Sequence, residues 1–176
     1  LNIGEKMNTI HLMVGIQGSG KTTFSKKLSE ELGIKIISTD EVRKQNPNIK
    51  EEMVWPLAYD MCANEIKNDK DVIFDATSIT PKVRKRLYDN IKERTNNFQI
   101  GCYFFKVDVK VCKSRVAKRN NIEGEINLPL EVVEKFNNSL VFPTYDEPIV
   151  FIKVINELGN IVDETTTVSY THLRAH

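Results

Sequence analysis

Residues 15–22, which read G-I-Q-G-S-G-K-T, constrain this chain more than any other stretch. They fit G-x-x-x-x-G-K-[S/T], a spacing whose glycines let backbone N–H groups wrap around a phosphate. The apolar residues just before the loop predict a strand, and residues 23–32 carry an apolar side chain at every fourth position, which predicts a helix. A strand, this loop and a helix in that order predict a site for a nucleoside triphosphate.

The residues of this loop have individual expected roles. Lys21 is expected to reach the β- and γ-phosphates of ATP, and the Thr22 hydroxyl to ligate Mg²⁺. Thr23 is expected to touch the α-phosphate, and the start of the helix adds a favourable dipole. The full set expected to bind the nucleotide is Gly15, Gln17, Gly18, Ser19, Gly20, Lys21, Thr22 and Thr23.

Length and composition indicate one ordinary globular domain. The chain has 176 residues, of which 40% are apolar and 28% are charged. No apolar run is long enough to cross a bilayer, and no signal peptide is visible, so a cytoplasmic protein without a membrane or an obligate protein partner is expected. Three cysteines without C-x-x-C spacing indicate reduced thiols. Residues 7–164 are expected to form the domain, and residues 165–176, which lack a clear period, a non-native or disordered tail.

Strands alternating with helices predict the fold class. Apolar runs at 9–14, 34–37, 71–75, 98–107 and 149–155 indicate strands, with a short edge strand at 160–162. The alternation predicts a P-loop NTPase fold of the α/β class. This is a three-layer α/β/α sandwich with a parallel sheet of about five strands, helices on both faces and a helical lid.

Two acidic residues follow predicted strands. Asp40 and Arg43 come after the second strand, three residues apart on one helical face, and are expected to point toward the phosphate loop. The alternative is that Thr39 or Asp40 only caps the helix. Asp75 ends the third strand, where a carboxylate typically holds a Mg²⁺-bound water or orients a neighbouring side chain. Thr77 follows it and is expected on the acceptor side.

Arginines supply the remaining candidates. The helix that Pro81 opens is expected to leave Arg84 on its more exposed side, available to the acceptor. Arg115 and Arg119 share a face of a basic helix at 109–120, and a polar stretch at 121–127 follows, as in a lid that closes over phosphate. The alternative is an ordinary surface helix.

Two aromatic features have mainly structural interpretations. His11 lies within the first strand and is expected to be packed and not to act as a ligand. Trp55, Tyr59, Cys62 and Ile66 form a stripe at helical spacing, which predicts core. Stacking of Trp55 or Tyr59 on a base is the alternative.

These motifs together carry a resemblance. G-x-x-x-x-G-K-T, S-T-D-E-V-R at 38–43, F-D-A-T at 74–77 and K-R-N at 118–120, with L-P-L-E-V-V following, resemble the kinase domain of the phage polynucleotide 5′-hydroxyl kinase family and its small relatives. The resemblance covers residues 7–155. It implies that Asp40 is the general base, that Arg43 contacts the acceptor phosphate, that Asp75 supports the site and that lid arginines bind the donor phosphates.

Two departures from that family bear on function. Its R-N-x-x-R pattern would place an arginine at Glu123, which shifts the lid role to Arg115 and Arg119, and Thr77 stands where Asn is frequent. The expected activity is transfer of the γ-phosphoryl group of ATP to a hydroxyl, first of all the 5′-hydroxyl of a polynucleotide. The alternatives are a kinase for a nucleoside, sugar or nucleotide-sugar, and a non-kinase ATP-hydrolysing switch protein.

Overall fold

One six-stranded sheet organises the molecule. The structure, a computed structural model, describes residues 6–168. The strand order is β2-β3-β1-β4-β5-β6, with the first five strands parallel and β6 antiparallel to β5. The strands are β1 (Asn8–Val14), β2 (Lys35–Ser38), β3 (Val72–Asp75), β4 (Phe98–Phe105), β5 (Phe151–Ile155) and β6 (Ile161–Thr166). The predicted α/β class and parallel sheet are confirmed.

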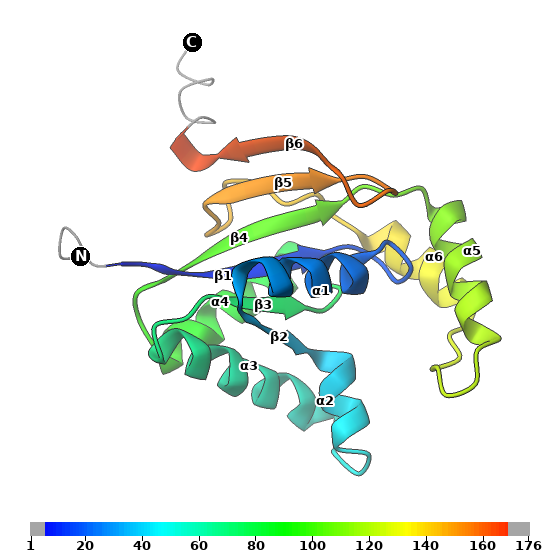
Figure 1. The fold of residues 1–176 in the computed structure, drawn as a ribbon, viewed down its shortest axis with the longest axis horizontal. Helices are drawn as coiled ribbons and strands as arrows, with labels where there is room; N and C mark the ends of the chain where they lie inside the picture. Colours follow the sequence, from blue (N-terminus) through cyan, green and yellow to red (C-terminus); the bar gives the residue numbers. More distant parts are fainter. Residues whose placement is uncertain (1–5, 169–176) are drawn as a thin grey trace.

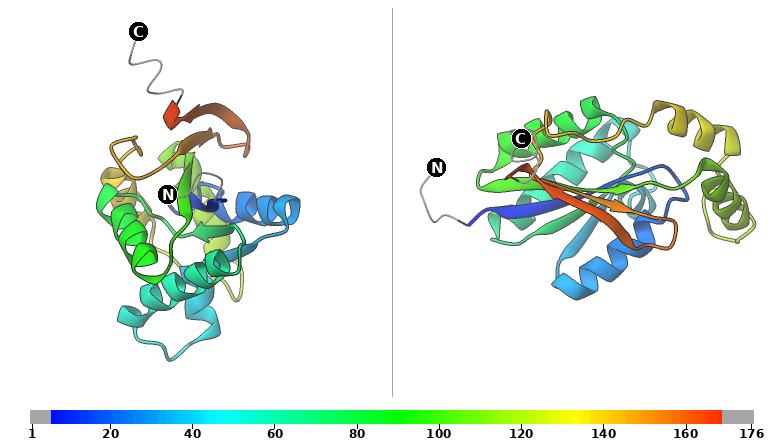
Figure 2. Two further views of the ribbon diagram at one scale, coloured as in Figure 1. Left: turned by 90° about the vertical axis from the view of Figure 1, so that its left-hand side faces the viewer. Right: turned by 90° about the horizontal axis from the view of Figure 1, so that it is seen from above.

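Helices cover both faces of the sheet (Figures 1 and 2). α1 lies on one face and α3 and α4 on the other, whereas α5 and α6 lie beyond the carboxyl ends of the strands. The helices are α1 (Lys21–Leu32), α2 (Thr39–Gln45), α3 (Glu51–Lys67), α4 (Pro81–Arg94), α5 (Val109–Asn120) and α6 (Leu130–Ser139). Within residues 6–168, no helix has both the length and the apolar character that a membrane span requires.

The central strand β1 is buried along its whole length. Leu12 and Val14 pack in the cluster under α3 and α4, and Met13 packs in the cluster under α1. A strand enclosed on both faces needs apolar residues on both, which is why β1 is a nearly continuous apolar run. Its carboxyl end therefore emerges from the middle of the core and fixes where the phosphate loop begins.

The stripe on α3 is core, as predicted. Tyr59, Cys62 and Ile66 are buried, and the Trp55 ring packs 6.1 Å from the Phe74 ring on β3, measured between centroids. The three cysteines are buried and free, which agrees with reduced thiols.

Three details concern the ends of α3, α1 and β6. The pattern around Trp55 predicts a helix from about residue 50 to residue 68, and α3 at Glu51–Lys67 agrees with that; Pro56 lies inside it, and the acidic residues of its first turn favour the early start over one near Val54. Leu32 is 49% exposed and does not continue the inward face of α1. β6 runs to Thr166, beyond the expected domain end at 164. Most of the expected tail, residues 169–176, lies outside the described residues.

His11 is packed in the sheet, as expected. Its Nδ1 lies 2.8 Å from the Tyr103 hydroxyl oxygen, and its Nε2 lies 3.2 Å from Oδ2 of Asp71. Burial lowers the pKa of His11 below its ordinary value, although Asp71 opposes that shift.

This shift predicts a pH dependence of stability. Because the folded state disfavours the charged imidazole, the unfolded chain binds more protons below about pH 6.5, so the free energy of unfolding falls as the pH decreases from that value. The contribution has a slope of at most about 1.4 kcal/mol per pH unit. Urea unfolding of wild type and His11→Asn between pH 7.5 and 5.5 should show a smaller loss for the variant. Equal losses in the two proteins would contradict this account.

Candidate active site

The phosphate loop joins β1 to α1 at the carboxyl edge of the sheet. Gly18 and Gly20 have φ values of 80° and 101°, a left-handed conformation that glycine adopts without strain. Ser19 ties the loop closed, because its backbone N–H and its hydroxyl both donate to the Ile16 carbonyl. Gln17 lies half-buried on the loop, and its Oε1 atom has no hydrogen-bond partner within the described chain.

Lys21 is buried inside this loop. Its ammonium donates to the carbonyl oxygen of Gly15 at 2.7 Å. Burial lowers the pKa of Lys21, and the negative charges of Asp75 and Asp40 oppose that shift. Since a backbone carbonyl is a neutral acceptor, an anionic phosphate oxygen would be a stronger partner for the same ammonium. The loop therefore holds a buried cation that an anion would stabilise.

Thr22 and Asp75 meet directly beside Lys21. The Thr22 hydroxyl donates to Oδ2 of Asp75 at 3.2 Å. Burial raises the pKa of Asp75, which Lys21 and Thr22 oppose and Asp40 reinforces. Strand pairing accounts for the contact, since β3 lies next to β1 with Asp75 opposite Met13.

These two oxygen ligands fit Mg²⁺. In the part of the chain that the structure describes, no three His, Cys, Asp or Glu side chains gather into a metal cluster. Mg²⁺ accepts such a site, because it is commonly held by one or two protein groups together with water and substrate phosphates. Thr22 and Asp75 are the residues that would hold it.

Asp40 and Arg43 lie together on α2. Ser38 caps this helix by accepting the Glu41 N–H, so neither Thr39 nor Asp40 is the cap. The Asp40 carboxylate accepts from Nη1 of Arg43 at 2.9 Å. The charge of Asp40 acts on both Lys21 and Asp75, so Asp40 lies near the phosphate loop.

Glu51 is a member of this group that the sequence motifs do not indicate. Both its carboxylate oxygens accept from the Arg43 guanidinium, with Nη2 to Oε1 at 2.5 Å. This contact raises the pKa of Arg43 and lowers that of Glu51. Glu51 opens α3, and the packing of α2 against α3 brings it to Arg43.

The helix α5 packs directly on the phosphate loop. A Cβ atom placed on Gly18 would lie 2.5 Å from the Cys112 carbonyl oxygen and 3.0 Å from a Val116 methyl carbon. Arg115 donates to the Gly18 carbonyl at 3.2 Å and also to the carbonyl of Glu157, and the charge of Arg119 acts on Lys21. The helix is therefore part of the loop's surroundings and not only a surface element.

The expectation that Arg84 lies on an exposed face is wrong. Its guanidinium is buried, donates to both carboxylate oxygens of Glu147, and also donates to the Ser78 carbonyl. Position 84 falls on the packed side of α4 with Leu87 and Ile91. A contact with substrate would require this ion pair to open. Thr77 is half-buried, and its carbonyl accepts the Gly15 N–H at 3.2 Å.

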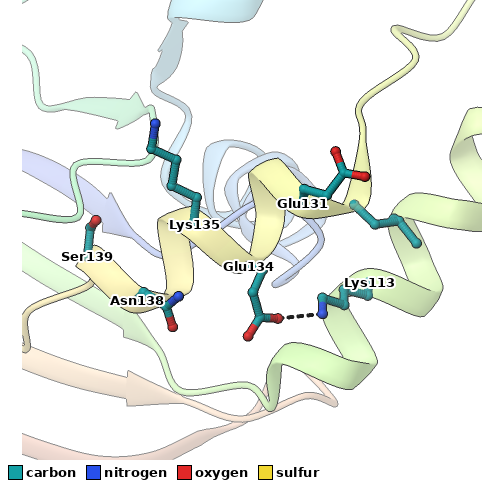
Figure 3. A pocket seen from close by; sticks show the side chains of 7 residues that line it. Lys113, Glu131, Glu134, Lys135, Asn138 and Ser139 are labelled. Atoms are coloured by element: carbon teal, nitrogen blue, oxygen red, sulfur yellow. Dashed lines mark ion pairs between the residues drawn. The ribbon is translucent and has the colours of Figure 1, made fainter.

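A pocket lined by side chains of α5 and α6 does not include these groups (Figure 3). An ion pair between Lys113 and Glu134 crosses it. Its other lining residues are Leu130, Glu131, Lys135, Asn138 and Ser139, none of them an expected site residue. The candidate site is therefore defined by the side chains around the phosphate loop and not by this pocket.

Three features define a P-loop nucleotide-binding site of the kinase type. They are a buried lysine in a glycine-rich loop, an aspartate at a strand end that pairs with the threonine of the loop, and a helix that packs on the loop and carries two arginines. A family model described as an AAA domain matches residues 10–143. The chain belongs to that family, and its domain is a P-loop kinase domain.

Solved structures share this fold. A chain of the Pnkp1/Rnl/Hen1 RNA repair complex has a TM-score of 0.67 at 23% identity over 79% of this chain and 46% of that one. A fungal RNA kinase has a TM-score of 0.60 at 15% identity over 88% and 80% of the two chains. A gluconokinase from Sinorhizobium meliloti 1021 has a TM-score of 0.55 at 15% identity over 86% and 84%. A comparison with curated proteins found no match.

The contact between Gly18 and α5 predicts that alanine at position 18 lowers the free energy of unfolding more than alanine at position 33. Gly18→Ala adds a clash with the Cys112 carbonyl to a left-handed backbone, whereas Gly33→Ala has a φ of 65° but no atom within 4 Å of the new methyl group. Overpacking should make the Gly18 variant less stable than the Gly33 variant by about 1–3 kcal/mol. Urea unfolding measures the difference. Equal losses would show that α5 does not press on the loop.

Replacing Lys21 separates stability from function. Lys21→Met keeps most of the side-chain volume and removes a charge that burial disfavours. The melting temperature of the nucleotide-free protein should stay the same or rise, while ATP turnover should fall at least about a hundredfold. Differential scanning calorimetry and a turnover assay test both halves. A large fall in melting temperature, or retained turnover, would be the opposite outcome.

Proposed function

We propose that this protein transfers the γ-phosphoryl group of ATP to the 5′-hydroxyl of a polynucleotide. The observation that carries the proposal is the pair of Asp40 and Arg43 at the end of β2, a carboxylate and a guanidinium in contact, with the carboxylate close enough for its charge to act on the buried Lys21. A kinase needs a group that accepts the hydroxyl proton and groups that hold two anionic substrates. The pair supplies the groups proposed to act on the acceptor, and the phosphate loop supplies those proposed to bind the donor.

The donor side follows from the charges around the loop. Phosphoryl transfer spreads negative charge over the equatorial oxygens, so positioned cations and N–H groups supply most of the catalysis. Lys21, Arg115 and Arg119 are the cations proposed to face the donor phosphates, and Thr23 is proposed to touch the α-phosphate. A Mg²⁺ ion held by Thr22 and Asp75 would supply further positive charge to these oxygens.

The acceptor side assigns one role to each residue of the α2 pair. Asp40 takes the proton of the attacking hydroxyl, which requires an ionised carboxylate within hydrogen-bond reach. Arg43 binds an anionic group next to that hydroxyl in exchange for one of its present carboxylate partners, Asp40 or Glu51, because a guanidinium offers paired N–H donors to anionic oxygens. Thr77 is proposed as a further contact for the acceptor.

The contacts of Arg43 favour an acceptor with an anionic group near its hydroxyl, as a polynucleotide has, over a small neutral acceptor. A polynucleotide 5′ end carries a phosphodiester close to its 5′-hydroxyl, whereas a nucleoside or an uncharged sugar offers Arg43 no anionic group. The alternative is a small-molecule kinase, since the similar folds include a gluconokinase as well as an RNA kinase. A switch protein that only hydrolyses ATP gives Asp40 and Arg43 no role.

A label-transfer screen tests the proposal. The protein is incubated with γ-labelled ATP, Mg²⁺ and, separately, a 5′-hydroxyl oligonucleotide, the same oligonucleotide with a 5′-phosphate, nucleosides, gluconate and water. Label on the 5′-hydroxyl oligonucleotide alone is the expected result. Label on a nucleoside or sugar instead would favour a small-molecule kinase over a polynucleotide kinase. Label only in free phosphate would favour the switch protein.

Asp40→Asn tests the general base. The variant should lose about 10²–10⁴-fold in turnover, since that is the usual contribution of a positioned base. Its affinity for ATP should stay close to that of wild type, because Asp40 makes no proposed contact with the donor. Glu41→Gln is the matched control, an exposed acid on the same turn whose carboxylate lies 4.0 Å from Nζ of Lys44. Unchanged turnover in Asp40→Asn would falsify the assignment.

Arg43→Ala tests the acceptor contact. The variant should raise the KM for the 5′-hydroxyl oligonucleotide more than the KM for ATP, because the lost guanidinium serves the acceptor. Lys44→Ala, which removes a neighbouring exposed cation, should leave both values near those of wild type. Steady-state kinetics with each substrate varied in turn measure the split. A larger rise in the KM for ATP would move Arg43 to the donor side.

A further inference from the structure

A buried ion pair between Arg84 and Glu147 lies behind the candidate site. The side chains are 2% and 11% exposed. Nε of Arg84 donates to Oε1 of Glu147 at 2.6 Å, and Nη2 donates to Oε2 at 3.0 Å. Removing two charges from water is costly, and an apolar pair of similar volume often stabilises a fold as well or better. Stability alone therefore gives a weak reason for this pair.

The third donor of Arg84 holds the segment that follows Asp75. Nη1 donates to the carbonyl oxygen of Ser78 at 2.9 Å. Ser78 is buried and has a φ of 46°, a left-handed conformation that a residue with a Cβ atom adopts only when its surroundings hold it there. The guanidinium fixes the orientation of this peptide.

The held segment touches the phosphate loop at two points. The Thr77 carbonyl accepts the Gly15 N–H at 3.2 Å, and the carboxylate of Asp75 accepts the Thr22 hydroxyl at 3.2 Å. Both contacts lie within three residues of Ser78. A change in the Ser78 peptide would therefore displace the groups that adjoin the start of the loop and the proposed Mg²⁺ ligands.

Glu147 connects the same segment to the chain that follows the helices α5 and α6. Its Oε2 also accepts the Thr144 N–H at 3.1 Å, and the Val141 N–H donates to the Ile79 carbonyl at 2.9 Å. Residues 141–147 lead from α6 to β5, so the chain that leaves the α5–α6 pair is fastened to residues 78 and 79. Through the ion pair, the segment between α6 and β5 is therefore linked to the β3–α4 connection, which in turn contacts the phosphate loop.

We propose that Arg84 and Glu147 are positioning residues that set the phosphate loop and Asp75 for ATP·Mg²⁺ through the Ser78 peptide. Without the pair, Ser78 relaxes to a common backbone conformation, Thr77 moves from Gly15, and the site binds the nucleotide less tightly. This inference rests on the proposed nucleotide site and is independent of the acceptor.

The test compares a broken pair with an apolar pair. Arg84→Met leaves the Glu147 charge buried alone and should lower the urea midpoint, whereas the double variant Arg84→Met/Glu147→Met should restore it toward that of wild type. Binding of ATP in the presence of Mg²⁺ is then measured by calorimetry without any acceptor. The double variant should regain stability and still bind ATP at least tenfold more weakly than wild type. Wild-type affinity in a stable double variant would overturn the proposal.

Two further variants keep the test decisive if the double variant does not fold. Arg84→Lys retains the charge but has a single donor group for Glu147 and Ser78, so it should fold and bind ATP at least threefold more weakly; wild-type affinity would overturn the proposal. Arg94 lies on α4, as Arg84 does, and forms a more exposed ion pair with Asp60 of α3; Arg94→Met removes that pair and should leave the affinity unchanged. A tenfold loss in this control would show that any change on α4 disturbs the site, which would equally overturn the assignment.

The readout separates this inference from the proposed function. If the wild-type protein binds no ATP, both the proposed nucleotide site and the proposed positioning role are refuted. If the wild-type protein binds ATP but labels no oligonucleotide, only the proposed acceptor is refuted. The ATP affinities of the Arg84 and Glu147 variants would then still decide the role of the pair.

Discussion

The burial of the Lys21 ammonium is the interaction on which the rest of the site depends. A buried cation needs acceptors and opposite charge nearby, and the fold supplies the Gly15 carbonyl together with Asp75 and Asp40. These partners offset the cost of burial only in part, since the pKa of Lys21 remains lowered. The nucleotide-free protein thus holds a charge arrangement that an anionic ligand completes, in keeping with its membership of a family of P-loop kinase domains.

The strand order explains how this arrangement forms. β1 lies between β3 and β4, and β2 lies beyond β3, so the carboxyl ends of β1, β3 and β2 bring the phosphate loop, Asp75 and Asp40 to one edge of the sheet. α5 then presses against Gly18 from beyond that edge, where only a residue without a Cβ atom leaves room for it. The donor and acceptor groups thus come from separate elements that a single sheet aligns.

Local patterns in the sequence predict the sheet, the phosphate loop, the strand-end position of Asp75 and the proximity of Asp40 to Arg43, because each depends on spacing within a few residues. They do not predict the partners of Arg84 and Arg43. Glu147 is 63 residues from Arg84 along the chain, and Glu51 reaches Arg43 only through the packing of α2 on α3. The polar sequence around Arg84 also suggested an exposed face, because a charged residue is normally outside unless a distant partner neutralises it.

The central claim is that the donor binds at Lys21 and the acceptor hydroxyl binds at Asp40. A crystal structure with a non-hydrolysable ATP analogue, Mg²⁺ and a short 5′-hydroxyl oligonucleotide tests it most directly. The account predicts a γ-phosphate oxygen in contact with Nζ of Lys21 and the 5′-oxygen about 2.6–3.2 Å from a carboxylate oxygen of Asp40. A 5′ end bound away from Asp40, or a triphosphate bound away from residues 15–22, would contradict it.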